Sequence, residues 1–276
     1  MIFVVKASFV TYDGLISMEG MSTKGRGSGQ YHSHDKYELM LCIRGEVTID
    51  SGGNEVTAKA PCLILHRPYC IHYMICNENY VYERAKIYFD DNSLQGIDSR
   101  LVNPSDVFTE DLRILPLSRE QEKLFCQLFA LMEPKPQEHL RPFLLSAILR
   151  EITRIGQADA VPKEQQKKTM YISDVVRYIG EHYSEPLTAE EIAARYFVSV
   201  PKLNRDFRFY TQKSVREFLI HVRLQHAAKL LLNGYSVTNT THLVGFASET
   251  HFIRTFKAYY HITPHQYAKK QQFVKV

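Results

Sequence analysis

The sequence predicts an α+β protein of more than one domain: an N-terminal antiparallel β-barrel with two following helices, and then an all-α domain. Short apolar runs separated by Gly, Pro and Asn fill the first 90 residues. Helical periodicity replaces them after Pro116, and a two-helix unit occurs twice in the last hundred residues. The length of 276 residues is about twice that of a common domain.

Short strands are expected throughout the first region, residues 1–116. The expected strands cover residues 38–43, 47–49, 55–58, 62–65 and 80–89. This close spacing is typical of a sandwich or barrel. All five cysteines lie in the first half of the chain without a Cys-x-x-Cys pair, so we expect reduced, buried thiols.

Residues 117–156 carry two amphipathic helices. Ser118 and Gln121 have the spacing of a capping box, and apolar residues then recur at helical intervals to residue 132 and again over 140–155. The pair could pack on its own domain or on a second subunit, which would make it a dimerisation and transmission region. The polar stretch 157–169 is the expected linker to the last domain, residues 170–276.

Charge differs between the two halves. Residues 1–157 hold 17 Lys and Arg against 20 Asp and Glu, a net charge of −3, whereas residues 158–276 hold 17 against 10, a net charge of +7. The net positive charge of the second half therefore favours binding to a polyanionic partner. No apolar run approaches the roughly 20 residues of a membrane span, and no secretory signal is recognised, so a cytoplasmic location without a membrane partner is expected.

The last domain contains an internal repeat. Ser199, Leu203, Arg205 and Phe207 recur 49 residues later as Ser248, Phe252, Arg254 and Phe256. A capping box at Thr188 and Glu191 opens the short helix before the first unit, and Ser236 opens its counterpart. Each unit is a short helix, a tight turn and a second helix, which is the order of a helix-turn-helix.

In a helix-turn-helix, one face of the second helix anchors it and the other lies in the major groove of DNA. The predicted anchors are Leu203, Phe207, Phe252 and Phe256. The projecting residues are Pro201, Lys202, Asn204, Arg205 and Arg208 in the first unit, and Thr250, His251, Arg254 and Lys257 in the second. Arg pairs with guanine and Asn with adenine, whereas Lys202, Arg208 and Lys257 suit phosphates.

An apolar stripe between the units, from Val215 to Leu231, predicts a rigid helix that ends near Gly234. If it holds the two recognition helices about 34 Å apart, one chain reads two successive major grooves.

The last hundred residues resemble the DNA-binding domain of AraC-type (arabinose-regulator) transcription factors. The matching residues are Tyr183, Pro186-Leu187-Thr188, Glu191-Ile192-Ala193, Ser199, Leu203, Arg205, Phe207, Arg223-Leu224, Ala227, Leu230-Leu231, Gly245-Phe246, Phe252, Arg254, Phe256-Lys257, Ile262-Thr263-Pro264 and Tyr267. The resemblance implies sequence-specific promoter binding. It places the base-reading positions at Pro201, Asn204, Arg205, Thr250, His251 and Arg254.

Two departures from the family pattern affect local stability. Gln212 and His261 stand where the family has glycine, so a left-handed turn there carries a steric cost. The segment from Val237 to Val244 is poor in strong helix formers, and Thr241 replaces a smaller residue. We expect this helix to be marginally stable alone and to become firmer on DNA.

Four residues of the first region form a candidate pocket. His32 and His34 alternate on a strand and share a face, and Glu38 and His72 could join them from neighbouring strands. This set resembles the cupin pattern, most closely in its first motif, and the resemblance implies a sensor pocket. Three imidazoles and a carboxylate suit a divalent transition metal or the hydroxyls of an organic effector such as a sugar. Arg26 and Tyr37 are further candidates for the pocket.

These features predict a one-component, effector-responsive regulator that is not an enzyme and requires no cofactor. Its expected partners are promoter DNA, a small-molecule effector, a second copy in a homodimer, and RNA polymerase if the regulator is an activator. One rival interpretation is a metal-dependent cupin enzyme or a metal sensor fused to a DNA-binding domain. Another is an architectural DNA binder whose affinity no small molecule changes.

Overall fold

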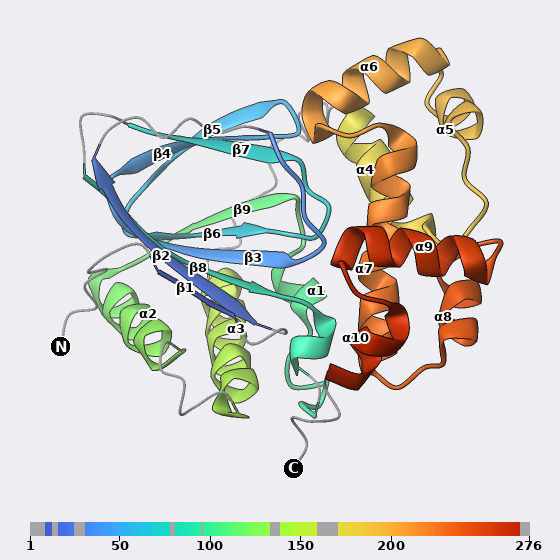
Figure 1. The fold of residues 1–276 in the computed structure, drawn as a ribbon. Coiled ribbons are helices and arrows are strands. Elements are labelled where there is room, and N and C mark those ends of the chain that lie inside the picture. The colour runs from blue at the N-terminus through green and yellow to red at the C-terminus, as the bar shows by residue number, and fades with distance from the viewer. Residues whose placement is uncertain are drawn as a thin grey trace. The chain divides into compact units, whose positions relative to one another are not determined.

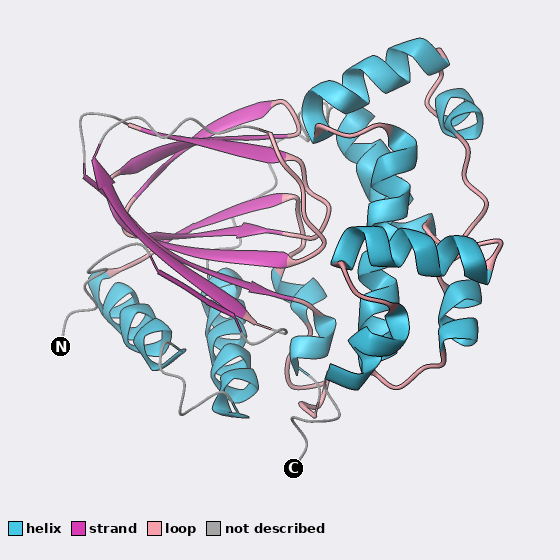
Figure 2. Ribbon diagram, viewed as in Figure 1, coloured by secondary structure: helices cyan, strands magenta, loops and turns pink. Residues whose placement is uncertain are grey.

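A computed structural model describes residues 9–12, 16–24, 31–77, 81–94, 96–132, 139–158 and 171–270. The chain divides into two compact units, residues 1–173 and 174–276 (Figure 1). The first contains strands with a few helices and the second is helical, which confirms the predicted α+β organisation (Figure 2). The predicted linker lies largely outside the described residues, and its first two residues, Gln157 and Ala158, are helical.

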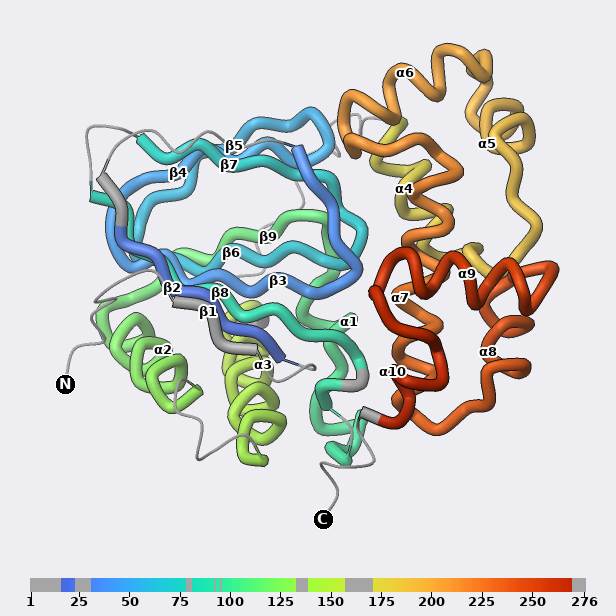
Figure 3. Tube along the Cα trace, viewed as in Figure 1, coloured from blue at the N-terminus to red at the C-terminus, as the bar shows by residue number. Residues whose placement is uncertain are grey.

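The first unit is built on two antiparallel sheets, which together we call the barrel. The strands are β1 (Phe9–Tyr12), β2 (Ser17–Lys24), β3 (Tyr37–Arg44), β4 (Glu46–Ser51), β5 (Asn54–Lys59), β6 (Cys62–His66), β7 (His72–Cys76), β8 (Val81–Phe89) and β9 (Leu112–Pro116). The larger sheet has the order β1-β2-β8-β3-β6-β9, and the smaller has the order β5-β4-β7. In Figure 3 the chain path shows the smaller sheet facing the larger one. The five strands expected between residues 38 and 89 are confirmed, whereas β1, β2, β7 and β9 were not predicted. The strand expected at His32 and His34 was wrong, because His32 forms only an isolated bridge and His34 lies outside any strand.

Alternation along β3 separates two cores. Leu39 and Leu41 point to the outer face, and Met40 and Cys42 point into the barrel. The inner core is apolar and draws on both sheets: it contains Met40, Cys42, Val47, Ile49, Ala58, Cys62, Ile64, Cys76 and Tyr82. All five cysteines are free and buried, as the sequence predicted.

The outer face of the larger sheet is covered by helices. A 3₁₀ turn (Asp91–Leu94) and α1 (Pro104–Val107) precede α2 (Arg119–Met132) and α3 (Arg141–Ala158). The capping box opens α2, because the Ser118 amide donates to Gln121 Oε1 at 2.7 Å and the Gln121 amide donates to Ser118 Oγ at 3.3 Å. Phe125, Phe129 and Ile148 join the outer core. Of the two packing alternatives, the structure therefore shows the helices on their own domain.

The second unit contains two helix-turn-helix pairs. Its helices are α4 (Tyr171–His182), which starts just before the division, α5 (Ala189–Arg195), α6 (Val200–Thr211), α7 (Val215–Leu232), α8 (Val237–Leu243), α9 (Glu249–Tyr260) and α10 (Pro264–Lys270). The side chains of Thr188, Ser199, Ser236 and Ser248 cap α5, α6, α8 and α9 as predicted. At 1.5 Å per residue, the 18 residues of α7 span roughly 27 Å.

The two recognition helices end in left-handed turns without glycine. Gln212 follows α6 with φ of 59°, and His261 follows α9 with φ of 62°. Residues other than glycine rarely adopt this backbone conformation, so the expected steric cost is present at both positions. Gly245, in contrast, has φ of 80° and lies so close to Ser184 that a Cβ atom would stand 2.4 Å from the Ser184 carbonyl oxygen. The turn between α8 and α9 therefore requires glycine at position 245.

Helix α8 is formed, but its packing contains an unfavourable group. Thr240 is fully buried, and its hydroxyl has no hydrogen-bond partner among the described residues. The neighbouring Thr241 hydroxyl donates to the Val237 carbonyl within the helix at 2.8 Å. A buried hydroxyl without a partner costs about 1–3 kcal/mol, which lowers the stability of a helix that already has weak helix formers.

We predict that the backbone amides of residues 237–244 exchange hydrogen faster in the free protein than those of α7. Binding of operator DNA should slow their exchange at least tenfold, because contacts to α9 on DNA would stabilise the pair of helices. Hydrogen exchange followed by mass spectrometry measures both states. Strong protection of this segment without DNA would contradict the expectation.

Candidate nucleic-acid interface and barrel cluster

Both recognition helices separate an anchoring face from an exposed face. Leu203 and Phe207 of α6, and Phe252 and Phe256 of α9, are fully buried. Of the predicted DNA-contacting residues, Pro201, Lys202, Arg205, Arg208, Thr250, Arg254 and Lys257 are exposed, and Asn204 and His251 are half-buried. The structure therefore leaves all nine side chains at least partly accessible on the two helices.

An acidic residue that the sequence reasoning missed distinguishes the two units. Asp206 of α6 accepts ion pairs from Lys202 Nζ at 2.5 Å and from Arg205 Nε at 3.2 Å. The corresponding position in α9 is Thr255, whose hydroxyl donates to the His251 carbonyl at 2.7 Å. The spacing of four residues between Lys202 and Asp206, which is typical of ion pairs along a helix, could have predicted this contact. The Asp206 carboxylate thus engages the Nε atom of Arg205.

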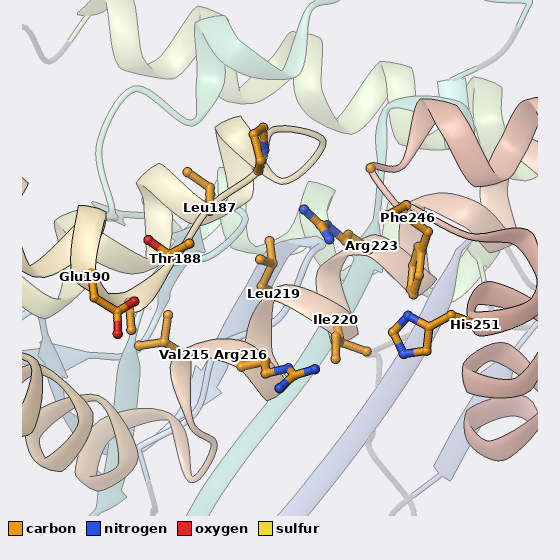
Figure 4. Close-up of a pocket in the computed structure, with 14 residues that line it drawn as sticks. Leu187, Thr188, Glu190, Val215, Arg216, Leu219, Ile220, Arg223, Phe246 and His251 are labelled. Carbon is orange, nitrogen blue, oxygen red and sulfur yellow. The ribbon is translucent and has the colours of Figure 1, made fainter.

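A cavity of about 630 Å³ lies between the two helix-turn-helix pairs. Figure 4 shows Thr188 and Glu190 on one side, Phe246 and His251 on the other, and the side chains of α7 between them. The cavity is lined by residues 186–190 from the start of α5, by residues 215, 216, 219, 220 and 223 of α7, and by residues 245–247 and 251 from the turn before α9 and from α9 itself.

Two arginines of α7 reach this cavity and differ in their contacts. The Arg223 guanidinium donates to the carbonyl oxygens of Tyr183 and Glu185, each at 2.7 Å, and so fixes the segment before α5. Arg216 is exposed, and no ion pair involves it among the described residues. Sequence reasoning did not identify Arg216, because it lies on the helix that was interpreted as a spacer.

In the barrel, the structure brings together the four predicted pocket residues, which we call the barrel cluster. His32 and His72 form a β-bridge with backbone hydrogen bonds of 3.0 and 3.1 Å. His34 Nε2 lies 3.0 Å from Glu38 Oε2, and His72 Nε2 lies 3.5 Å from the same oxygen. Candidate ligand atoms of His32, His34, Glu38 and His72 all lie within 4.8 Å of one another.

The structure adds Lys86 of β8 to this cluster. Its Nζ atom lies 2.6 Å from Glu38 Oε1, and both side chains are buried. The pairing of β3 with β8 places Met40 opposite Lys86 and Glu38 opposite Tyr88, so these residues share the inner face. The alternation of Arg84, Lys86 and Tyr88 with apolar residues in β8 was the signal for inward-pointing charges, and sequence reasoning did not use it.

The two remaining pocket candidates do not extend the cluster. Arg26 lies outside the described residues. Tyr37 lies on the outer face of β3, where its ring stacks on Phe89 at 5.1 Å and contacts Phe108 at 4.8 Å. Its assignment to the pocket was wrong because successive strand residues point to opposite faces, and Glu38 takes the inner one.

Burial and charge set the ionisation of the cluster. Burial alone raises the pKa of Glu38, but the Lys86 ammonium and hydrogen bonds with His34 and His72 hold that pKa well below its usual range. Burial lowers the pKa of His72 to about 4, with the Glu38 carboxylate opposing the shift. Glu38 is therefore a carboxylate and His72 a neutral imidazole at neutral pH.

Comparison with known proteins matches both units. The AraC-like ligand binding domain family matches residues 16–153, and the helix-turn-helix domain family matches residues 192–270. The chain belongs to the AraC family of transcription regulators. The resemblance inferred from sequence motifs is thereby confirmed for both halves.

Curated AraC-family relatives align over most of the chain. VirF, a virulence regulon transcriptional activator of Shigella flexneri, is 26% identical over 84% of this chain and 90% of its own. RhaS, a transcriptional activator of Yersinia pestis, is 22% identical over 84% of this chain and 86% of its own. Among solved structures, an apo ToxT variant from Vibrio cholerae covers 93% of this chain and 97% of its own at 10% identity, with a TM-score of 0.46.

No helix in the described part of the chain is long and apolar enough to cross a membrane. This finding agrees with the hydropathy pattern of the sequence, in which apolar runs are short.

Two sets of side chains in this AraC-family chain have donor atoms close enough together for a metal ion. The barrel cluster has suitable donor types, but the buried Lys86 ammonium shares its carboxylate. A second set, His66, Cys70 and His72, also has ligand atoms within 4.8 Å. The rings of His66 and His72 stack at 3.9 Å with an angle of 11° between them. An ion in the plane of one ring lies outside the plane of the other, so this set does not fit a shared ion.

We predict that Glu38→Gln and Lys86→Met each destabilise the barrel by about 3–5 kcal/mol, because each leaves a buried charge without its partner. The double variant should lose less than the sum of the two. Urea unfolding followed by near-UV circular dichroism measures the difference. Lys59→Met is the control: Lys59 pairs with Glu46 at 3.3 Å on the exposed surface, where a pair contributes about 0–1 kcal/mol. Additive losses in the double variant would show that the two buried groups are not coupled.

Proposed function

We propose that this AraC-family regulator is a one-component switch: a small molecule binds in the barrel, and two helix-turn-helix units bind one promoter sequence-specifically. The observation that carries the proposal is the repeated recognition helix, α6 and α9, with both copies anchored through fully buried residues on either side of α7. A promoter binder works where DNA is, so its place of action is the cytoplasm.

Each recognition helix is proposed to read one major groove. Asn204 and Arg205 supply bidentate pairing for adenine and guanine in the first groove, and Arg254 supplies it in the second. Pro201, Thr250 and His251 are proposed to lie against the bases. Lys202, Arg208 and Lys257 are proposed to contact phosphates. The length of α7, roughly 27 Å, is of the same order as the distance between two successive major grooves, about 34 Å.

The cavity between the pairs is proposed to receive the DNA backbone that lies between these two grooves. His251, at the start of α9, borders the cavity, and exposed Arg216 provides a positive charge there. A phosphate beside Arg216 would fix the register of the chain on the duplex without reading its sequence.

The barrel is proposed to bind the effector at its polar end. His32 is exposed and His34 is half-buried, so imidazole nitrogens line the approach to the buried Glu38. Such groups form hydrogen bonds with hydroxyls, which favours an organic ligand such as a sugar over a catalytic role. Effector binding changes transcription only if the ligand prefers one of two states of the regulator.

We also propose that the regulator acts as a homodimer and, if it activates, contacts RNA polymerase. Although α2 and α3 pack on their own sheet, they keep large apolar side chains exposed. These are Leu124 and Leu131 of α2 and Phe143 of α3, together with Leu140 just before α3, and Phe143 is 60% exposed. Leu124 and Leu131 are two turns apart and share a face of α2, as a helix that packs on a second copy requires.

We predict that Arg205→Ala and Arg254→Ala each weaken binding to the selected operator by about 1–3 kcal/mol and relax the base preference in one groove. Lys257→Ala and Arg216→Ala should weaken binding to all sequences alike and reduce the salt dependence, because they remove phosphate contacts. Fluorescence anisotropy on operator and scrambled duplexes at several salt concentrations separates the two classes. If Arg205→Ala and Arg254→Ala leave specific binding unchanged, the assigned base readers are wrong.

We predict that Leu131→Asp and Phe143→Asp each raise the dissociation constant of the homodimer at least tenfold, because a carboxylate would be buried in the interface. Val56→Asp is the matched control, since Val56 is an exposed apolar residue of the smaller sheet. Sedimentation velocity over a concentration series measures self-association. A chain that stays monomeric, or a dimer insensitive to both substitutions, would refute this interface.

A further inference from the structure

We propose that the Lys86 ammonium takes the place of a metal ion in the barrel cluster, so that His32, His34, Glu38 and His72 form a metal-independent site. The proposal rests on the geometry of the cluster and does not depend on how the protein binds DNA.

The imidazoles are arranged as they would be around a metal. His34 Nδ1 lies 2.8 Å from the Lys36 carbonyl oxygen, and His72 Nδ1 lies 3.2 Å from the Cys70 carbonyl oxygen. A histidine whose Nδ1–H donates to a backbone carbonyl turns Nε2 toward the centre of the site, which is the usual orientation of a metal ligand. Both Nε2 atoms lie within 3.5 Å of Glu38 Oε2.

The centre toward which these atoms turn already has a cation. Lys86 Nζ lies 2.6 Å from Glu38 Oε1, the other oxygen of the same carboxylate. A divalent ion bound to Glu38 would lie next to this ammonium and be repelled by it. Like charges in a buried site are screened little by water, so the ammonium and the metal compete for one carboxylate.

Neighbouring contacts hold Lys86 in this position. Its Nζ donates to the Tyr88 hydroxyl at 3.3 Å, and only 5% of its side chain is exposed. Glu19, which lies opposite Lys86 in the pairing of β2 with β8, accepts an ion pair from Arg84 at 2.8 Å. Arg84 thus occupies the neighbouring carboxylate, and Glu38 is the carboxylate that pairs with Lys86.

The test is a titration of the full-length protein with Co²⁺, whose visible absorption reports bound imidazole and carboxylate. Wild-type protein should bind Co²⁺ at least tenfold more weakly than Lys86→Met, which should bind one equivalent. Adding His34→Ala to Lys86→Met should abolish that binding. Lys59→Met removes an exposed lysine of the same domain and should behave as the wild type.

A second readout covers the loss of stability expected for Lys86→Met. Because the metal would replace the missing positive charge, Co²⁺ should raise the unfolding temperature of Lys86→Met and leave that of the wild type unchanged. One equivalent of tightly bound metal in the wild type, measured by elemental analysis of untagged protein or by the titration, would overturn the proposal. A folded Lys86→Met protein that binds Co²⁺ no better than the wild type would also overturn it.

Discussion

The distance between the two recognition helices depends on α7. Its first half packs on the first helix-turn-helix pair, where Phe218 contacts Phe207 with ring centroids 5.4 Å apart. Its second half supplies Leu224, Ala227 and Leu231 to the core that buries Phe252 and Phe256. A helix without an internal glycine or proline bends little, so the two pairs are held at a fixed separation. We propose that this separation, and not any single side chain, lets one chain bind two grooves.

The barrel is organised by a different constraint, the pairing of buried charges. Its interior is apolar around Met40 and Ile64, and polar around Glu38 and Lys86. Each buried charge at the polar end needs a partner, and the alternation of β3 and β8 places Glu38 and Lys86 on the same inner face. A ligand that enters here has to compete with these internal contacts. Such competition would give two states of the barrel different affinities for the ligand.

Much of the helical unit could be predicted from the sequence because its signals are local. Ser199 and Ser248 mark helix starts, and the spacing of Leu203 and Phe207 marks the buried face. The ion pair of Glu38 with Lys86 could not be found this way, because it depends on the register of two strands far apart in the sequence. The strand β2 was missed because its apolar residues are sparse. The four members of the barrel cluster were predictable because their pattern resembles a known family.

We propose that one chain reads two successive major grooves through α6 and α9. Hydroxyl-radical and methylation-protection footprinting of the selected operator tests it most directly. We expect two protected major-groove segments for each bound chain, with centres about 10–10.5 base pairs apart. Arg205→Ala should lose methylation protection in one segment and Arg254→Ala in the other. A single protected groove per chain, or the same change in both variants, would contradict it.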